Sequence, residues 1–255
     1  MSVVTTISAP CVVFALRRES MYFRRAYPCQ QGFPHAPCRA QFRGPASRTV
    51  LMLESGIGGA AMEAALRWCL SGPRLGGLCY RPRLLVSMGF SGALQTGQRV
   101  GDLVLATEVV DQQGNHWPAL HPTTSASQET TLGRVLTVPQ LVGDPREKER
   151  LGQQHQAVAV DMESAAAARL CQEHNVPFAC LRVISDDQNT ALSPHLVALL
   201  RRGRVSATRL AGTVLRHPQL IGELCRLAGN TRRAARQLLA VGSLLSAECR
   251  MQNAE

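Results

Sequence analysis

The chain has 255 residues, of which 45% are apolar and 4% aromatic, so a single α/β domain can bury a full core of mainly Leu, Val and Ala. The formal net charge is +10, but residues 201–255 hold ten arginines against three acidic residues, so most of the excess is C-terminal. No run approaches the ~18 apolar residues that a membrane-spanning helix requires.

The cysteines and histidines give no sign of a metal site. The nine cysteines are scattered, without a Cys-x-x-Cys pair, and the seven histidines lack metal-ligand spacing. We therefore expect reduced thiols in a cytoplasmic protein, with no metal and no cofactor. The apolar first sixteen residues lack the basic start of a secretory leader, and they predict a first buried strand instead.

Apolar runs bounded by turn residues alternate with segments of helical spacing through the first 190 residues. The alternation predicts one α/β domain, residues 1–192, with a mixed, mostly parallel central sheet flanked by helices. We expect an irregular stretch at 28–37 and a long polar loop at 111–131. Strands are expected at 10–16, 48–53, 83–88, 102–110, 134–138 and 178–184, and helices at 60–70 and 162–174.

Residues 193–255 show no further strand pattern. Leu and Ala repeat at three- and four-residue spacing over 218–227 and 232–245, with Arg between them. This pattern predicts a basic amphipathic helical extension that packs on the domain. The alternative is peripheral contact with an anionic inner membrane surface through 201–250, because cationic amphipathic helices also lie on such surfaces.

Two glycine clusters follow predicted strands. Ser55-Gly56-Ile57-Gly58 stands between a strand and a helix, where backbone N–H groups can approach a ligand, and Gly89-Phe90-Ser91-Gly92 ends the next strand. Neither is a Gly-x-Gly-x-x-Gly motif or a phosphate-binding loop with its lysine. A tight structural turn is an equal alternative for both clusters.

Three carboxylates stand where α/β proteins place their ligand crevices, next to the ends of strands. Glu19 follows the first predicted strand, Glu163 begins an Ala-rich helix, and Asp186 follows the last buried strand. The plain alternatives are a surface ion pair for Glu19 and a helix cap for Asp186. A charged Glu163 among small residues would be destabilising unless it is hydrogen-bonded, and a ligand diol would satisfy it.

Several segments occur together in one order: Ala-Leu-Arg-Arg-Glu, Glu-Ser-Gly-Ile-Gly, Ser-Met-Gly-Phe-Ser-Gly-Ala-Leu with Val-Gly-Asp-Leu-Val-Leu-Ala, and Val-Asp-Met-Glu-Ser with Arg-Val-Ile-Ser-Asp. They cover most of residues 10–190. In this order and spacing the chain resembles the nucleoside phosphorylase and nucleosidase superfamily, particularly its methylthioadenosine/S-adenosylhomocysteine nucleosidase branch. Each segment is weak alone, and together they are specific.

The resemblance implies cleavage of the bond between a purine and a ribose. In that reaction Glu19 orients the attacking water, Glu163 binds the ribose 2′- and 3′-hydroxyls, and Asp186 donates a proton to N7 of the leaving base. The physical logic is independent of the family. Bond cleavage builds positive charge on the sugar and negative charge on the base, so carboxylates near the sugar and an acid at the base both favour the transition state.

The resemblance also implies the neighbours of these acids. Ser185 steers Asp186, Met162 lies under the ribose, and Arg182 corresponds to the family's arginine near the nucleophile, which makes it the third expected catalytic residue. The other expected substrate contacts are Ser55, Gly56, Ile57, Gly89, Phe90, Leu141 and Val142.

Some positions depart from the family pattern. Phe90 stands where a small polar residue is frequent, and Leu141 replaces an aromatic ring that would stack on the base. Arg17 and Arg18 replace residues that are commonly acidic. The two arginines keep phosphorolysis as the second hypothesis, because a phosphate nucleophile needs cationic ligands. An ionised Glu19 would repel phosphate, so hydrolysis is favoured.

The tail sequence, from Leu-Arg-His-Pro-Gln-Leu to Arg-Leu-Ala-Gly-Asn-Thr-Arg-Arg-Ala, resembles the hopanoid-biosynthesis-associated phosphorylase-like proteins. This resemblance implies release of adenine from adenosylhopane, a lipid-linked nucleoside, and such a substrate would give basic amphipathic helices a purpose at a membrane. Methylthioadenosine, adenosylhomocysteine and futalosine are the alternative substrates. The superfamily also implies a homo-oligomer.

A non-enzymatic reading is a basic nucleic-acid-binding module, which the sequence pI of about 9.7 would suit. Aromatic residues are sparse, no recognition motif is present, and the excess charge lies outside the α/β pattern. We therefore expect a small-molecule nucleoside as the partner, and no nucleic acid.

Overall fold

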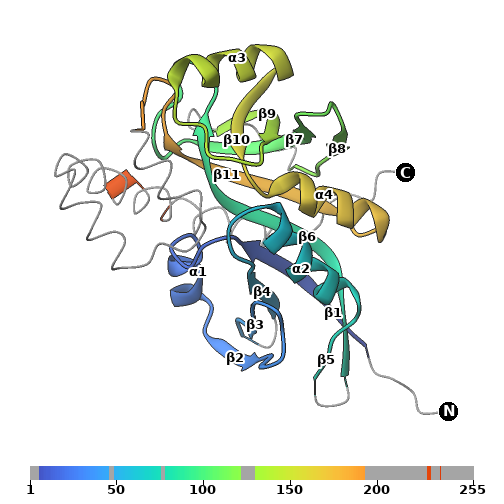
Figure 1. Cartoon of the computed structure of the whole chain (residues 1–255). Coiled ribbons are helices and arrows are strands. Elements are labelled where there is room, and N and C mark those ends of the chain that lie inside the picture. The colour runs from blue at the N-terminus through green and yellow to red at the C-terminus, as the bar shows by residue number, and fades with distance from the viewer. Residues whose placement is uncertain are drawn as a thin grey trace, which may run out of the picture.

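The computed structural model describes residues 6–45, 49–75, 78–121, 130–192, 229–230 and 236. Strands and helices alternate along this part of the chain (Figure 1). In chain order the elements are β1 (Thr6–Phe14), α1 (Met21–Ala26), β2 (Cys29–Gly32), β3 (Arg39–Arg43), β4 (Val50–Glu54), α2 (Gly59–Leu70), β5 (Arg74–Leu75), β6 (Leu78–Ala93), β7 (Leu103–Asp111), β8 (His116–Pro118), β9 (Thr130–Thr137), α3 (Pro145–His155), β10 (Ala157–Asp161), α4 (Ser164–Glu173) and β11 (Phe178–Asp186).

The strands form one mixed sheet in the order β10-β9-β7-β11-β6-β1-β4-β3-β2. β1 pairs in parallel with β4 and β6, and β11 pairs in parallel with β6. β10 also pairs with the end of β6, so β6, β11, β7, β9 and β10 close into a ring. The long strand β6 belongs to both the ring and the open half, and the ends of β1, β10 and β11 therefore lie near one another.

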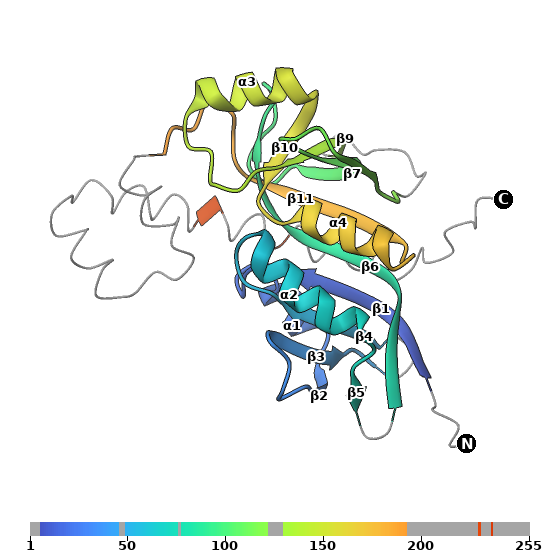
Figure 2. The same cartoon turned by 45° about the vertical axis from the view of Figure 1, so that its right-hand side comes forward.

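Two helices, α2 and α4, pack side by side on one face of the sheet (Figure 2). Small residues line the contact face of α4, where Ala167 and Ala168 are buried, and Leu66 and Cys69 of α2 are buried beside them. Small side chains let α4 approach the sheet closely. This packing confirms the predicted α/β domain with a mixed central sheet flanked by helices.

Several elements differ from the sequence-based expectation. β2 lies inside the stretch 28–37 that was expected to be irregular, because its residues pair with β3. β8 lies inside the expected loop 111–131 and pairs with β7. The helix α3 and the strand β10 were not predicted, since α3 is largely polar and β10 has only five residues.

The predicted extension, 193–255, lies outside the described residues except for 229–230 and 236. Nε of Arg236 donates to the hydroxyl of Tyr22 on α1 at 3.2 Å. Among the described residues no helix is both long and apolar enough to cross a membrane.

Candidate active site

The ends of β1, β10 and β11 surround one cavity of about 280 Å³. The three predicted acids reach it from these three places, although they are far apart in the sequence. Nine of the predicted site residues line this cavity: Glu19, Ile57, Phe90, Leu141, Val142, Met162, Glu163, Ser185 and Asp186.

Glu19 is buried at the loop that follows β1, with 4% of its surface exposed. Its carboxylate accepts hydrogen bonds from the backbone N–H of Leu16 at 2.7 Å and of Phe90 at 2.9 Å. Burial raises the pKa of Glu19, and the two backbone N–H groups and Arg182 oppose the rise. The surface ion pair considered for Glu19 is therefore wrong.

Gly89 makes room for Glu19 against β6. A Cβ atom at this position would lie 2.8 Å from Oε1 of Glu19, which is closer than non-bonded carbon and oxygen atoms approach each other. Gly89 itself does not line the cavity. A glycine is therefore needed at this position because the β6 backbone lies close to the Glu19 carboxylate.

Glu163 lies between β10 and α4 and points into the cavity. Its Oε1 accepts from the backbone N–H of Gly58 at 2.6 Å, and its Oε2 from that of Met162 at 3.2 Å. Burial and the neighbouring Asp161 raise the pKa of Glu163 to about 8. The two backbone donors therefore do not fully offset the cost of burying the charged carboxylate, and further hydrogen-bond donors in the cavity would stabilise it.

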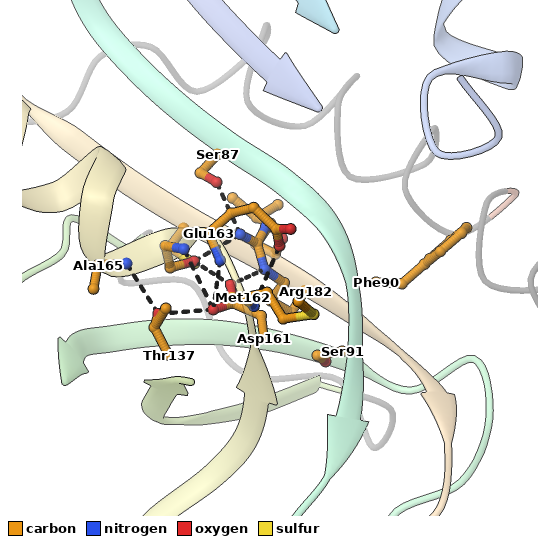
Figure 3. Close-up of polar contacts among 12 residues, drawn as sticks. Ser87, Phe90, Ser91, Thr137, Asp161, Met162, Glu163, Ala165 and Arg182 are labelled. Atoms are coloured by element: carbon orange, nitrogen blue, oxygen red, sulfur yellow. Dashed lines mark hydrogen bonds and ion pairs between the residues drawn. The ribbon is translucent and has the colours of Figure 1, made fainter. Parts of the chain in front are cut away.

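Asp161, which the sequence did not single out, is the centre of a buried network beneath the cavity (Figure 3). It accepts from Nε of Arg182 at 2.7 Å and from the hydroxyl of Thr137 at 2.7 Å. Arg182 also donates to Ser87 at 2.9 Å and Ser164 at 2.6 Å. The network fixes the end of β10, from which Met162 and Glu163 project.

Arg182 was predicted as a catalytic residue, but it does not line the cavity. It is buried on β11, and its side chain donates four hydrogen bonds within the protein, to Asp161, Leu181, Ser87 and Ser164. Its cation acts on the cavity through the fixed network and through its charge, which favours the ionised form of Glu19.

Asp186 ends β11, with 6% of its surface exposed. The hydroxyl of Ser185 donates to Oδ1 at 2.8 Å, as predicted for a residue that steers Asp186. The ammonium of Lys148 lies 2.5 Å from Oδ2. Gly92 makes room for this carboxylate, since a Cβ there would lie 3.1 Å from Oδ2. The alternative of Asp186 as a helix cap is wrong, because its side chain serves the cavity and Lys148.

The remaining wall of the cavity is mostly apolar. Met162 lies beside Glu163, and Phe90 extends away from the Asp161 network on the far side of β6 (Figure 3). The other apolar lining residues include Leu16, Ile57, Val138, Leu141, Val142, Val160 and Leu192. Such a wall suits a flat base and an apolar substituent, while polar groups line the cavity at the carboxylates, Ser185, Arg18, Ser91 and Gln140.

Ser55 and Gly56 were predicted as substrate contacts, but they do not line the cavity. The hydroxyl of Ser55 donates to the carbonyl of Phe14 at 3.3 Å, and Gly56 has a φ of 100°. The structural-turn alternative therefore holds for these two residues. Gly58 in the same turn orients Glu163 through its N–H.

The paired arginines differ in their environment. Arg18 lines the cavity, whereas Arg17 is 70% exposed and its Nε lies 4.0 Å from Oε2 of Glu54. Within the described part of the chain, no group of three or more His, Cys, Asp or Glu side chains is arranged to hold a metal ion.

Comparison with known proteins places this cavity in a family. A family model described as the phosphorylase superfamily matches residues 21–216. The chain belongs to the phosphorylase superfamily. Membership in this superfamily, together with the relatives below, confirms the prediction of an enzyme that cleaves glycosyl bonds.

The matching relatives are nucleosidases. The chain is 28% identical over 163 residues to a 5′-methylthioadenosine/S-adenosylhomocysteine nucleosidase of Bacillus cytotoxicus, covering 54% of this chain and 68% of that protein. The corresponding protein of Bacillus anthracis is 26% identical over 167 residues, covering 55% and 69%.

Solved structures share the fold. The S. pneumoniae 5′-methylthioadenosine/S-adenosylhomocysteine nucleosidase gives a TM-score of 0.66 at 19% identity, covering 92% of this chain and 97% of that one. The futalosine hydrolase of Helicobacter pylori gives 0.62 at 17% identity, covering 95% and 99%.

Proposed function

We propose that the chain hydrolyses the N-glycosidic bond of a 5′-substituted adenine nucleoside and releases adenine. The observation that carries this proposal is the convergence of Glu19, Glu163 and Asp186 on one largely apolar cavity. The sequence relatives are nucleosidases of methylthioadenosine and adenosylhomocysteine, which supports adenine as the base.

In the proposed reaction Glu163 holds the ribose and Met162 lies under it. The carboxylate of Glu163 accepts hydrogen bonds from the 2′- and 3′-hydroxyls, and its negative charge stabilises the cationic sugar of the transition state. Burial raises the pKa of Glu163 to about 8, which opposes ionisation. The substrate hydroxyls and the positive charge that develops on the sugar both favour the ionised form that this role needs.

Glu19 accepts the proton of the attacking water. Its raised pKa suits a general base, since a stronger base takes a proton more readily. The N–H groups of Leu16 and Phe90 hold the carboxylate in one orientation. Arg182 supports this step as a positioning residue, through its charge and the Asp161 network.

Asp186 donates its proton to N7 as the bond between C1′ and N9 breaks. The electron pair of that bond goes to the base, which becomes neutral adenine once it is protonated. Ser185 orients the carboxyl group. The hydroxide derived from water completes the reaction by bonding to C1′.

Adenosylhopane is the substrate that we propose for the 5′ side. Its support is the apolar lining at Leu16, Ile57 and Phe90 and the resemblance of the tail to hopanoid-associated proteins. We propose further that residues 193–255 form a basic helical extension that can contact a membrane, and that the chain is a homo-oligomer. Methylthioadenosine, adenosylhomocysteine and futalosine are the alternatives for the substrate.

Phosphorolysis is a second candidate, favoured by Arg18 in the cavity lining. One experiment separates the two. The protein is incubated with methylthioadenosine, adenosylhomocysteine, inosine, futalosine and adenosylhopane, with and without phosphate, and free base is measured. Hydrolysis predicts adenine and free ribose product without phosphate. Strict phosphate dependence with a ribose 1-phosphate product would establish the phosphorylase, and no free base from any nucleoside would refute both.

A further inference from the structure

Lys148 is the only lysine among the 28 basic residues of the chain, and it is completely buried. It belongs to α3, which covers the end of β10, and it lies behind the cavity wall rather than in it. A buried ammonium is strongly unfavourable unless its donors are all used and its charge is balanced. The position therefore needs an explanation from its partners.

The three donors of the Lys148 ammonium have three acceptors. Nζ donates to Oδ2 of Asp186 at 2.5 Å, to the carbonyl of Asp187 at 2.8 Å and to the carbonyl of Thr190 at 3.4 Å. A compact ammonium fits this arrangement, whereas a guanidinium is larger and planar. The site thus holds one cation against the carboxyl group that faces the substrate cavity.

We propose that Lys148 is a positioning residue for Asp186. Its ammonium fixes the orientation of the Asp186 carboxyl group and neutralises the carboxylate that remains once the proton has passed to the leaving base. The inference rests on the proposed function. In the step itself the O–H bond of Asp186 breaks and the N7–H bond forms, while Lys148 keeps its three protons.

The other charged groups around the pair are engaged elsewhere. Asp144 caps the start of α3 and accepts from the N–H of Arg146, and the half-buried Glu147 of α3 pairs with Arg150. In the loop after β11, the Asp187 carboxylate accepts from the hydroxyl of Thr190.

From β6 and β10, uncharged residues pack against Asp186. Gly92 of β6 is close to Oδ2 of Asp186, and Val160 of β10 lies beside Gly92. The other charged residues that line the cavity are Arg18, Glu19, Asp161 and Glu163. Lys148 is therefore the cation in direct contact with Asp186 among the described residues.

The proposal predicts a loss that is confined to kcat. In the full-length Lys148→Met variant the Asp186 carboxyl group is no longer held in one orientation, and its negative charge is no longer neutralised once the proton has passed to the base. We therefore expect kcat to drop about tenfold.

Methylthioadenosine is the substrate for the test, with adenine release measured over a range of substrate concentrations so that kcat and KM are separated. KM should stay within about twofold, since Lys148 does not line the cavity. Lys148→Arg keeps the charge, so its kcat should be higher than that of Lys148→Met. Lys148→Gln is neutral and keeps a donor, and it replaces Lys148→Met if that variant does not fold.

A double variant provides the second readout. Since Lys148 acts through Asp186, Lys148→Met should change the turnover of Asp186→Asn by less than about threefold. Wild-type kcat in both neutral variants would overturn the inference, as would a full additional loss in the double variant. Failure of the proposed function is distinct, because the wild type would then release no base at all.

Discussion

Asp186 is the residue on which base departure depends in the proposed reaction. Replacing Asp186 with Asn removes the proton donor while keeping the shape of the side chain. We expect kcat for methylthioadenosine to fall at least about a hundredfold, since a general acid contributes that much or more. Initial rates of adenine release at saturating substrate measure this.

Asp187→Asn is the matched control for this variant. The Asp187 side chain bonds Thr190 rather than the cavity, so its replacement should leave kcat within about threefold of the wild type. Far-UV circular dichroism and the thermal midpoint show whether each variant is folded. A folded Asp186→Asn protein with wild-type turnover would remove Asp186 from the mechanism.

Glu163 links the cavity to the stability of the whole domain. Its pKa is about 8 in the folded protein against an ordinary value of 4.5. The folded state therefore holds a proton that the unfolded state has lost between these pH values. The stabilisation is complete below pH 4.5 and disappears as pH rises through 8.

Glu163→Gln should remove this dependence. We expect the wild-type free energy of unfolding to fall between pH 5 and pH 8 relative to the variant, by a few kcal/mol at most, because one pKa unit corresponds to about 1.4 kcal/mol. Urea unfolding of the ligand-free protein at both pH values measures it. Parallel curves for the two proteins would mean that Glu163 titrates near its ordinary value.

At the scale of elements, β6 carries two glycines that admit two carboxylates. A methyl group on Gly89 would lie 2.8 Å from Oε1 of Glu19, so Gly89→Ala should displace that side chain from the N–H of Phe90. We expect turnover to fall at least about tenfold, since a misplaced general base loses most of its effect. Steady-state kinetics of the purified variant provide the test.

Gly59→Ala is the control for Gly89→Ala. A Cβ atom at Gly59 would meet the Ala166 side chain at 3.8 Å, which is an ordinary contact, and alanine is favoured at the start of a helix over glycine. This variant should keep wild-type turnover. Equal losses of turnover in both variants would show that any added methyl group near α2 and β6 lowers activity. The close approach of Gly89 to Glu19 would then not be the cause.

Long or strongly apolar elements could be predicted from the sequence. The expected helix 60–70 corresponds to α2, and the expected strand 178–184 corresponds to most of β11. β10 was missed because a run of four apolar residues that ends in an aspartate, next to a helix, is too short to show a periodicity. α3 was missed because it is mainly polar and buries only a narrow stripe, Lys148, Leu151 and Gly152.

The site was predictable only in part for a related reason. Glu19 and Asp186 follow predicted strands, Glu163 begins a predicted helix, and the resemblance assigns roles to the three acids in sequence order. Lys148 and Asp161 are recognised by their partners, which lie 38 and 21 residues away along the chain. A sequence gives only indirect signs of such residues. For Lys148, the sign is that it is the single lysine among many arginines.

At the scale of the whole molecule, most of the excess positive charge belongs to a different part of the sequence from the residues that line the cavity. Residues 201–255 carry ten arginines, while the three acids belong to the α/β domain. If the tail brings the domain to a lipid-linked nucleoside, its charge should affect turnover only where the substrate is in a membrane. Each arginine near an anionic surface contributes about 1 kcal/mol of binding free energy.

Replacing Arg201, Arg202 and Arg204 with Gln tests this. With adenosylhopane in anionic phosphatidylglycerol vesicles, we expect adenine release at limiting vesicle concentration to fall roughly tenfold or more, since three such contacts are lost. Release from methylthioadenosine in solution should be unchanged. Replacing three arginines of the domain, Arg67, Arg74 and Arg81, with Gln gives the control of equal charge. Equal losses on both substrates would show that the tail arginines serve the structure, because a membrane contact cannot alter turnover of a soluble nucleoside.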